Sequence, residues 1–414
     1  MNKFLFTLLF ACSLYFINAQ TINDSVTLGA GYANQIWYSL ENDEQGTALN
    51  SEWDLAFSTA GQGANILINS AIGTKLWAYP SSDTSGWTTV DTTGITTWTL
   101  LYNSDTSWNE GAFRQNMSSN PYDLGWGIYD PITHFVVGDS LFVIKLSDNS
   151  YKKLWIQQLA SGTYTFRYAN LDGANDNVVS LVKTDYTNKN FGYYSLQTNT
   201  AFNREPISAE WDLLFTKYTA FIPNPYGVTG VLCNKEVTIA EARPVDVITI
   251  SHDDYPYTTP MNTVGYDWKS FAGTWTIEDS SAYFVKGLSG NIWKIIFTGF
   301  GGSADGKFKF TKELVSGVGL KEIANDKIGE LSVYPNPSNG NSFTVLYELN
   351  QPASNVELSI IDALGREIYA TTTENGIGFY QLELNGINLK PGMHFISLSI
   401  DGHSIQQKLF VKGL

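Results

Sequence analysis

The sequence predicts an all-β fold, and three observations support it. Apolar and polar residues alternate with a period of two, completely so in Lys307-Phe308-Lys309-Phe310, which is typical of antiparallel strands with one solvated face. Turn-forming clusters separate such stretches, for example at 81–86 and 223–227. One unit of sequence also occurs twice. We therefore expect a two-repeat antiparallel β-domain, then a linker and a small C-terminal β-sandwich, with only 240–242 helical.

The N-terminus has the pattern of a signal peptide over residues 1–19. Lys3 precedes an uncharged apolar run from Phe4 to Ile17, and Ala19 provides a small residue at a cleavage point. No later stretch approaches the ~20 apolar residues of a transmembrane helix, so no membrane span is expected. Cys233 is the only cysteine after the signal peptide, so no intramolecular disulfide can form.

The two repeats are predicted at 20–185 and 186–316. Their landmarks are Tyr38-Ser39-Leu40 and Trp53-Asp54-Leu55 in the first repeat, and Tyr194-Ser195-Leu196 and Trp211-Asp212-Leu213 in the second. Because strand side chains alternate between faces, the tryptophan and leucine share one face in each copy. We expect Trp53 and Trp211 to be buried at matching positions. Asp54 and Asp212 are expected to bond across a sheet rather than to form a catalytic pair.

Composition limits the range of partners. The chain has a formal net charge of -15 and a hydrophobic content of 43%, with 14% aromatic residues, which supports a large core. The acidic balance repels phosphate backbones and excludes a nucleic-acid partner. All 12 tryptophans precede Lys294, and residues 317–330 are rich in glycine and charge, which predicts a linker there.

The C-terminal segment, residues 331–414, carries four landmarks: Val333-Tyr334-Pro335-Asn336-Pro337-Ser338-Asn339-Gly340, Asp362-Ala363-Leu364-Gly365-Arg366, Leu389-Lys390-Pro391-Gly392-Met393 and Gln407-Lys408-Leu409-Phe410-Val411. Their order and spacing resemble the type A sorting domain of type IX secretion, which carries cargo across the outer membrane of certain Gram-negative bacteria. The resemblance implies an extracellular or cell-surface protein, with the type IX machinery as the partner of 331–414. It assigns the sorting motif to Tyr334, Pro335, Asn336, Pro337, Gly340, Gly365, Gly392 and Lys408.

The duplicated Trp-Asp-Leu strand, together with Asn291–Phe300, resembles the HmuY-like family of secreted proteins, whose best-known members capture haem. The resemblance implies a non-enzymatic ligand-binding protein with haem as the ligand. Bis-histidine ligation needs two imidazoles on opposite faces of one porphyrin. His394 and His403 belong to the sorting domain, so His134 and His252 are the candidate haem ligands.

A second function class stays open, namely carbohydrate or adhesin-like binding. Exposed tryptophans stack on sugar rings, and Trp87, Trp98 and Trp108 lie in Thr- and Ser-rich surroundings that suit such a role. An oxygen-rich stretch at 170–177 leaves calcium binding open, although its spacing does not fit an EF-hand loop.

No arrangement of residues predicts an enzyme. Gly138-Asp139-Ser140-Leu141 spells the nucleophile block of the GDSL hydrolases, but its serine leads into a predicted strand instead of a helix. No histidine has an aspartate three positions earlier, so the pair that would activate this serine is missing from the sequence.

Overall fold

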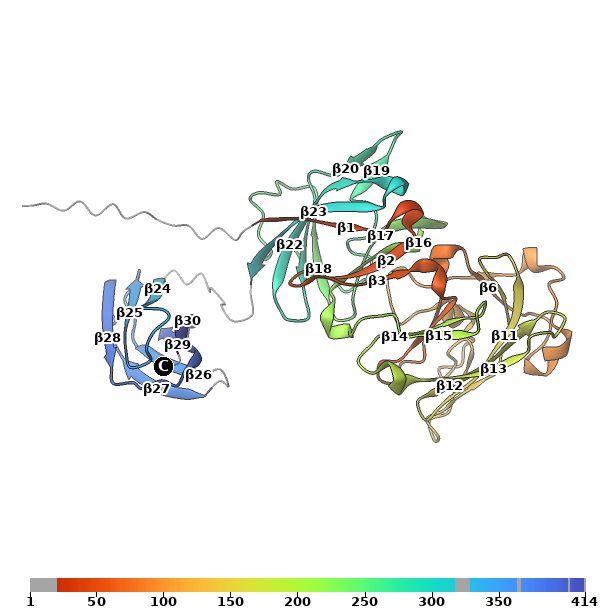
Figure 1. Cartoon of the computed structure of the whole chain (residues 1–414), viewed down its shortest axis with the longest axis horizontal. Helices are drawn as coiled ribbons and strands as arrows, with labels where there is room; N and C mark the ends of the chain where they lie inside the picture. Colours follow the sequence, from red (N-terminus) through yellow and green to blue (C-terminus); the bar gives the residue numbers. More distant parts are fainter. Residues whose placement is uncertain (1–20, 317–327, 363–365, 401–402, 413–414) are drawn as a thin grey trace, which may run out of the picture. The chain divides into compact units, whose positions relative to one another are not determined.

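The structure is a computed structural model that describes residues 21–316, 328–362, 366–400 and 403–412 (Figure 1). The predicted signal peptide, most of the predicted linker and Gly365 lie outside the described residues. The chain divides into two compact units, Met1–Val315 and Ser316–Leu414. The described residues form strands and short 3-10 helices, which confirms the all-β prediction.

The helix expected at 240–242 was wrong, because these residues lie in a strand, β18 (Thr238–Ala242). Ala240 pairs with Phe284 of β21 (Ala282–Lys286), so pairing within the sheet outweighs the helical propensity of Ala and Glu. The 3-10 helices are η1 (Ala30–Tyr32), η2 (Asn50–Glu52), η3 (Ser70–Ile72), η4 (Thr84–Thr89), η5 (Ile95–Thr97), η6 (Ala112–Asn116), η7 (Lys183–Tyr186), η8 (Ser208–Glu210) and η9 (Gly302–Ala304).

The N-terminal unit contains two lobes, each with its own hydrophobic core. One lobe, the host lobe, is built from the two ends of the unit and has two main sheets, red and green to cyan in Figure 1. The first sheet is β1 (Ile22–Thr27), β23 (Lys307–Ser316), β22 (Ile292–Phe300), β21 and β18, in that order. The second is β17 (Pro225–Cys233), β16 (Leu213–Phe221), β2 (Asn34–Ser39) and β3 (Asp43–Leu49), and β19 (Lys269–Phe271) and β20 (Trp275–Ile277) form a separate hairpin. Aromatic residues of both main sheets fill the core, including Tyr38, Phe215 and Phe310.

The other lobe, the inserted lobe, lies in sequence between β3 and β16. Its larger sheet runs β13 (Asn177–Val182), β12 (Thr163–Asn170), β11 (Tyr151–Ala160), β10 (Phe142–Lys145), β6 (Lys75–Ala78) and β7 (Leu100–Leu101). In addition, β9 (Val136–Gly138) pairs with β11, and β8 (Gly127–Tyr129) pairs with β9. Its smaller sheet is β15 (Thr200–Phe202), β14 (Phe191–Ser195), β4 (Leu55–Ser58) and β5 (Ile66–Ile68). The core between these sheets contains Phe57, Phe142 and Tyr164.

The two sequence repeats exchange strands crosswise. The Tyr-Ser-Leu strand of the first repeat, β2, pairs with the Trp-Asp-Leu strand of the second, β16, with Tyr38 opposite Leu213. The Tyr-Ser-Leu strand of the second repeat, β14, pairs in the same register with β4 of the first, with Tyr194 opposite Leu55. The boundary expected at 185/186 therefore falls inside the inserted lobe, and each repeat contributes to both cores.

The repeated aspartates hold this exchange in place, as the sequence predicted. A carboxylate oxygen of Asp54 accepts the backbone N–H of Leu196 at 2.8 Å, and a carboxylate oxygen of Asp212 accepts that of Leu40 at the same distance. The preceding Trp53 and Trp211 are 8% and 2% exposed, which confirms their predicted burial.

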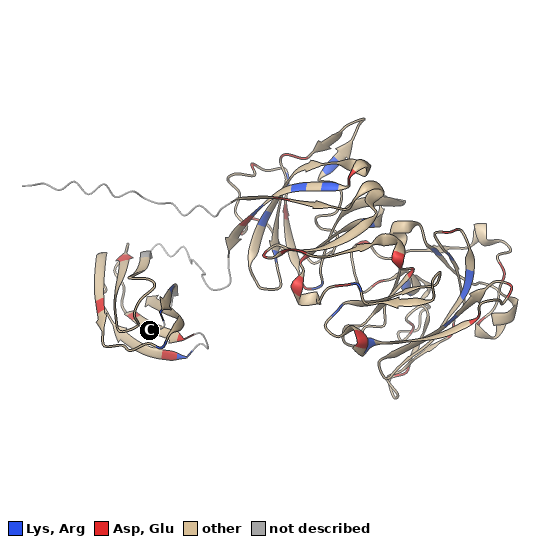
Figure 2. Ribbon diagram, in the orientation of Figure 1, with Lys and Arg blue, Asp and Glu red and all other residues tan. Residues whose placement is uncertain are grey.

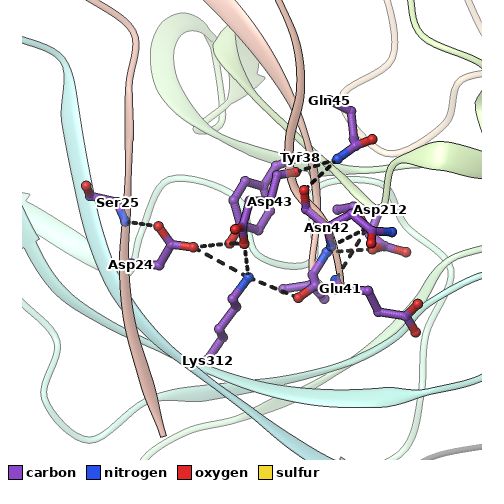
Figure 3. A network of polar contacts seen from close by, with 11 residues as sticks. Asp24, Ser25, Tyr38, Glu41, Asn42, Asp43, Gln45, Asp212 and Lys312 are labelled. Carbon is purple, nitrogen blue, oxygen red and sulfur yellow. Dashed lines mark hydrogen bonds and ion pairs between the residues drawn. The ribbon is translucent and has the colours of Figure 1, made fainter.

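An ion network around a buried lysine joins the first and last strands of the host lobe (Figure 3). The Lys312 ammonium on β23 pairs with Asp43 and, at 3.5 Å, with Asp24 of β1, and it donates to the Leu40 carbonyl at 3.0 Å. Burial and a hydrogen bond to Asp24 raise the pKa of Tyr38, so its hydroxyl stays protonated and donates to that carboxylate. The network links charged groups of both ends of the lobe, so it serves the scaffold.

The C-terminal unit is the predicted small β-sandwich. One sheet contains β24 (Ile328–Tyr334), β25 (Ser342–Leu349) and β28 (Gly378–Asn385). The other runs β27 (Glu367–Thr372), β26 (Val356–Asp362), β29 (Gly392–Ile400) and β30 (His403–Val411). Alternate residues of both sheets, such as Val345 and Leu398, are buried between them.

Candidate ligand pocket and sorting motif

A cavity of about 880 Å³ opens in the inserted lobe. Its walls come from loops at 61–66 and 121–129, from helix η6, and from the turn between β11 and β12. That turn is tight because Ser161 and Gly162 both have positive φ, 47° and 75°, as a two-residue hairpin connection requires. The cavity volume falls in the range of small-molecule sites, roughly 300–1,000 Å³.

Two tyrosines and a histidine form one wall. Asp130 begins the loop between β8 and β9 by accepting the N–H of Ile132, and this turn brings His134 back toward the strand. His134 Nδ1 lies 2.7 Å from the Tyr129 hydroxyl. The Tyr129 ring lies 6.3 Å from that of Tyr122, which is 47% exposed. The hydrogen bond orients Tyr129, which in turn supports an aromatic face open to solvent.

Three basic side chains line the cavity. They are Arg114 on η6, His134, and Lys183 on η7, and the lining contains neither Asp nor Glu. The Lys183 ammonium donates to the carbonyls of Gly61 and Gly63, at 3.1 and 2.5 Å. Burial, followed by repulsion from Lys235, lowers the pKa of Lys183 to about 8. Elsewhere charged residues of both signs are scattered along the ribbon (Figure 2). The cavity lining is therefore basic although the chain as a whole is acidic.

The two candidate haem ligands lie in different places. His134 lines the cavity, whereas His252 belongs to the host lobe, where its ring lies 6.3 Å from Phe284 of β21 and beside Asp253. All residues that line the cavity lie between Gly61 and Lys183, so His252 is not among them. The structure does not bring the two imidazoles together at this cavity, and its lining offers one histidine for bis-histidine ligation.

The expectation of exposed tryptophan platforms was wrong for Trp87, which is 6% exposed. It lies on η4, which folds over the outer face of the larger sheet, and the Arg167 guanidinium covers its ring at 4.7 Å. Trp98 is half-buried against the same cluster. Trp108 is also half-buried and donates its indole N–H to the Cys233 carbonyl, which connects the inserted lobe with the host lobe.

The oxygen-rich stretch at 170–177 is held by cations of the protein. Asp176 accepts two hydrogen bonds from Arg167, and Asn170 accepts one from Lys152. Among the described residues, no group of three His, Cys, Asp or Glu side chains is placed to hold a metal ion. No helix within the described part of the chain is long and apolar enough to cross a membrane.

The sorting motif joins the two ends of the C-terminal unit. The Asn336 side chain donates to the Lys408 carbonyl at 2.7 Å and accepts the Phe410 N–H at 2.9 Å, as a paired strand would. Gly340 has φ 78°, and a Cβ at this position would lie 2.7 Å from the Leu389 carbonyl oxygen, so a side chain does not fit.

Most of the other described residues of the sorting motif lie at or next to strand ends, whereas Lys408 lies within β30. Tyr334 and Lys408 are exposed, Pro335 and Pro337 follow cis peptide bonds, and Gly392 begins β29 with φ 129°. The landmarks at the start and the end of the sorting segment thus meet along β30.

Comparisons with solved structures show weak likenesses. Dimeric latent PorU from Porphyromonas gingivalis is 11% identical with a TM-score of 0.18, and the match covers 68% of this chain and 32% of PorU. The chain therefore spans about a third of the length of PorU. The EFF-1 fusogen on extracellular vesicles is 10% identical with a TM-score of 0.17, and the match covers 66% of each chain. The BSP domain of a biofilm-associated protein is 9% identical with a TM-score of 0.16, and the match covers 97% of this chain and 68% of that protein. Such scores carry no argument about fold or function.

A search of curated proteins finds no match. Residues 332–412, in contrast, match the family described as the secretion system C-terminal sorting domain. This match confirms the predicted type IX sorting domain, which implies an interaction with the type IX secretion machinery. The C-terminal unit is a sorting domain of that family, and the protein is exported to the cell surface or the extracellular space.

Proposed function

We propose that the protein is a non-enzymatic ligand-binding protein of the cell surface or the extracellular space, and that its binding site is the cavity of the inserted lobe. The observation that carries this proposal is the cavity itself, with a volume of about 880 Å³ and an exposed aromatic wall. The sorting domain delivers the protein outside the cell, where soluble and surface-bound ligands are accessible.

A saccharide is the ligand class that the cavity suits best. The Tyr122 ring is partly exposed and lies beside that of Tyr129, and an exposed aromatic ring can stack on the apolar face of a sugar ring. The side-chain amides of Gln62 and Asn109 also line the cavity, and amides both donate to and accept from hydroxyl groups.

Haem is the second candidate, supported by the HmuY-like resemblance and by the position of His134 on the cavity wall. Its Nδ1 is engaged by the Tyr129 hydroxyl, which leaves Nε2 as the nitrogen that would bind iron. Because His252 lies outside the lining, the second axial ligand would have to come from another residue, and we rank haem below a saccharide.

Binding assays on the mature protein test both candidates. In a glycan array and by calorimetry, Tyr122→Ala should weaken saccharide binding roughly fivefold, because stacking on a ring contributes about 1 kcal/mol. Tyr226→Ala is the control, since Tyr226 is also exposed, at 66% against 47% for Tyr122, but lies on β17 of the host lobe. Equal loss in both variants, or no binding of any glycan, would contradict the saccharide assignment.

A haemin titration tests whether haem, and not a saccharide, is the ligand. A Soret shift that His134→Ala abolishes and His252→Ala leaves unchanged would place haem in the cavity and displace the saccharide proposal. An unchanged spectrum on mixing haemin with the wild-type protein would eliminate haem.

A further inference from the structure

We propose that the ligand of the inserted-lobe cavity is an acidic saccharide, one that carries a carboxylate or sulfate group, and that Arg114 selects for this charge. This inference rests on the proposed function and adds to it the charge of the ligand.

The side chains that line the cavity are basic, whereas the chain as a whole carries a net negative charge. Asp and Glu outnumber Lys and Arg by 40 to 25 in the whole sequence, yet the lining has Arg114, His134 and Lys183 and no carboxylate. Basic groups from two 3-10 helices and one loop therefore meet at one cavity. In such a partly enclosed site, the field of a cation is screened less than on an open surface.

The cations lack carboxylate partners in the part of the chain that the structure describes. Arg114 forms none of the ion pairs found there, and Lys183 donates to two backbone carbonyls, which leave its positive charge uncompensated. An anion entering the cavity would supply the missing charge, and the planar Arg114 guanidinium suits the paired oxygens of a carboxylate or sulfate.

Two aspartates in the segments that form the cavity wall are engaged in turns of their own. Asp130 accepts the Ile132 N–H at 2.8 Å and the Thr133 hydroxyl at 3.0 Å in its own turn. Asp123 accepts the N–H groups of Ser118 and Gly125, both at 2.7 Å. Neither aspartate lines the cavity, so these groups do not neutralise Arg114 or Lys183.

The experiment compares saccharides that differ only in charge. The probes are oligogalacturonate and its methyl ester, and a sulfated oligosaccharide and its desulfated form, each titrated into the mature protein by calorimetry. We expect the acidic member of at least one pair to bind roughly tenfold or more tightly than its neutral counterpart, with an affinity that falls as salt rises.

Variants assign this preference to Arg114. Arg114→Gln should bring the two members of the pair to similar affinity. Lys75→Gln, at an exposed residue that begins β6, removes the same charge outside the cavity and should change neither affinity. A preference that survives in Arg114→Gln, or that Lys75→Gln removes equally, would overturn the role of Arg114.

The outcomes also separate the two proposals. Neutral saccharides that bind as tightly as acidic ones would overturn the charge inference and leave the saccharide-binding function standing. If none of the four probes and no array glycan binds, both proposals fail. If the acidic probes bind but Tyr122→Ala has no effect on them, the cavity is not the site and the inference fails.

Discussion

Replacing Asp54 with alanine should destabilise the inserted lobe, because this carboxylate joins strands of the two repeats. It is fully buried and accepts the Leu196 N–H at 2.8 Å, the Ser195 hydroxyl at 3.2 Å and the Gln197 side-chain amide at 3.1 Å. A buried N–H left without a partner costs about 1–3 kcal/mol, and each weaker bond adds about 0.5–1.5 kcal/mol. Burial raises the pKa of Asp54, so relief of its desolvation offsets part of this loss. We expect a net loss of about 2–4 kcal/mol.

Guanidinium unfolding of the mature protein measures this loss. All 12 tryptophans precede Lys294, so their fluorescence reports the N-terminal unit without a contribution from the sorting domain. Asp212→Ala should give a loss of similar size, because Asp212 has the equivalent role toward Leu40. Asp185→Ala removes an exposed carboxylate of the same lobe and should stay within about 0.5 kcal/mol. A midpoint for Asp54→Ala equal to that of Asp185→Ala would refute the structural role of the repeated aspartates.

Three further perturbations test other parts of the fold. Trp211→Ala should lower the free energy of unfolding by about 3–5 kcal/mol, because it removes a buried indole. Trp211→Phe should cost clearly less, because the indole nitrogen has no hydrogen-bond partner within the described structure, and equal losses in the two variants would contradict this. Burial lowers the pKa of Lys269 to about 7, so above that pH the unfolded chain binds more protons than the folded chain. The free energy of unfolding should therefore rise between pH 7 and 9, by about 1–3 kcal/mol more in the wild type than in Lys269→Met. In the sorting domain, Asn336→Ala should speed hydrogen exchange of the Phe410 amide at least several-fold, since that N–H loses its acceptor, and unchanged exchange would show that the motif does not hold β30.

The site could be predicted only in part. His134 was singled out as one of two histidines in the aromatic region, and it does line the cavity. Three other residues of the cavity lining, Arg114, Tyr129 and Lys183, carry no local motif. They meet only because segments far apart in the sequence converge in the fold. Tryptophans were the more obvious candidates for sugar stacking, but Trp87 is buried beneath Arg167. A flat aromatic residue in a polar stretch does not by itself report which face of a sheet it covers.

The sequence by itself determined the all-β class, the sorting domain and the burial of the repeated tryptophans. These features depend on the period of two and on motifs that are contiguous in the chain. Tertiary structure alone decided how the repeats combine. Similar strands can pair within a repeat or between repeats, and the aspartate bonds from Asp54 to Leu196 and from Asp212 to Leu40 show that they pair between them. Strand periodicity specifies which face is buried, whereas the choice of partner strand depends on contacts between residues far apart in the sequence.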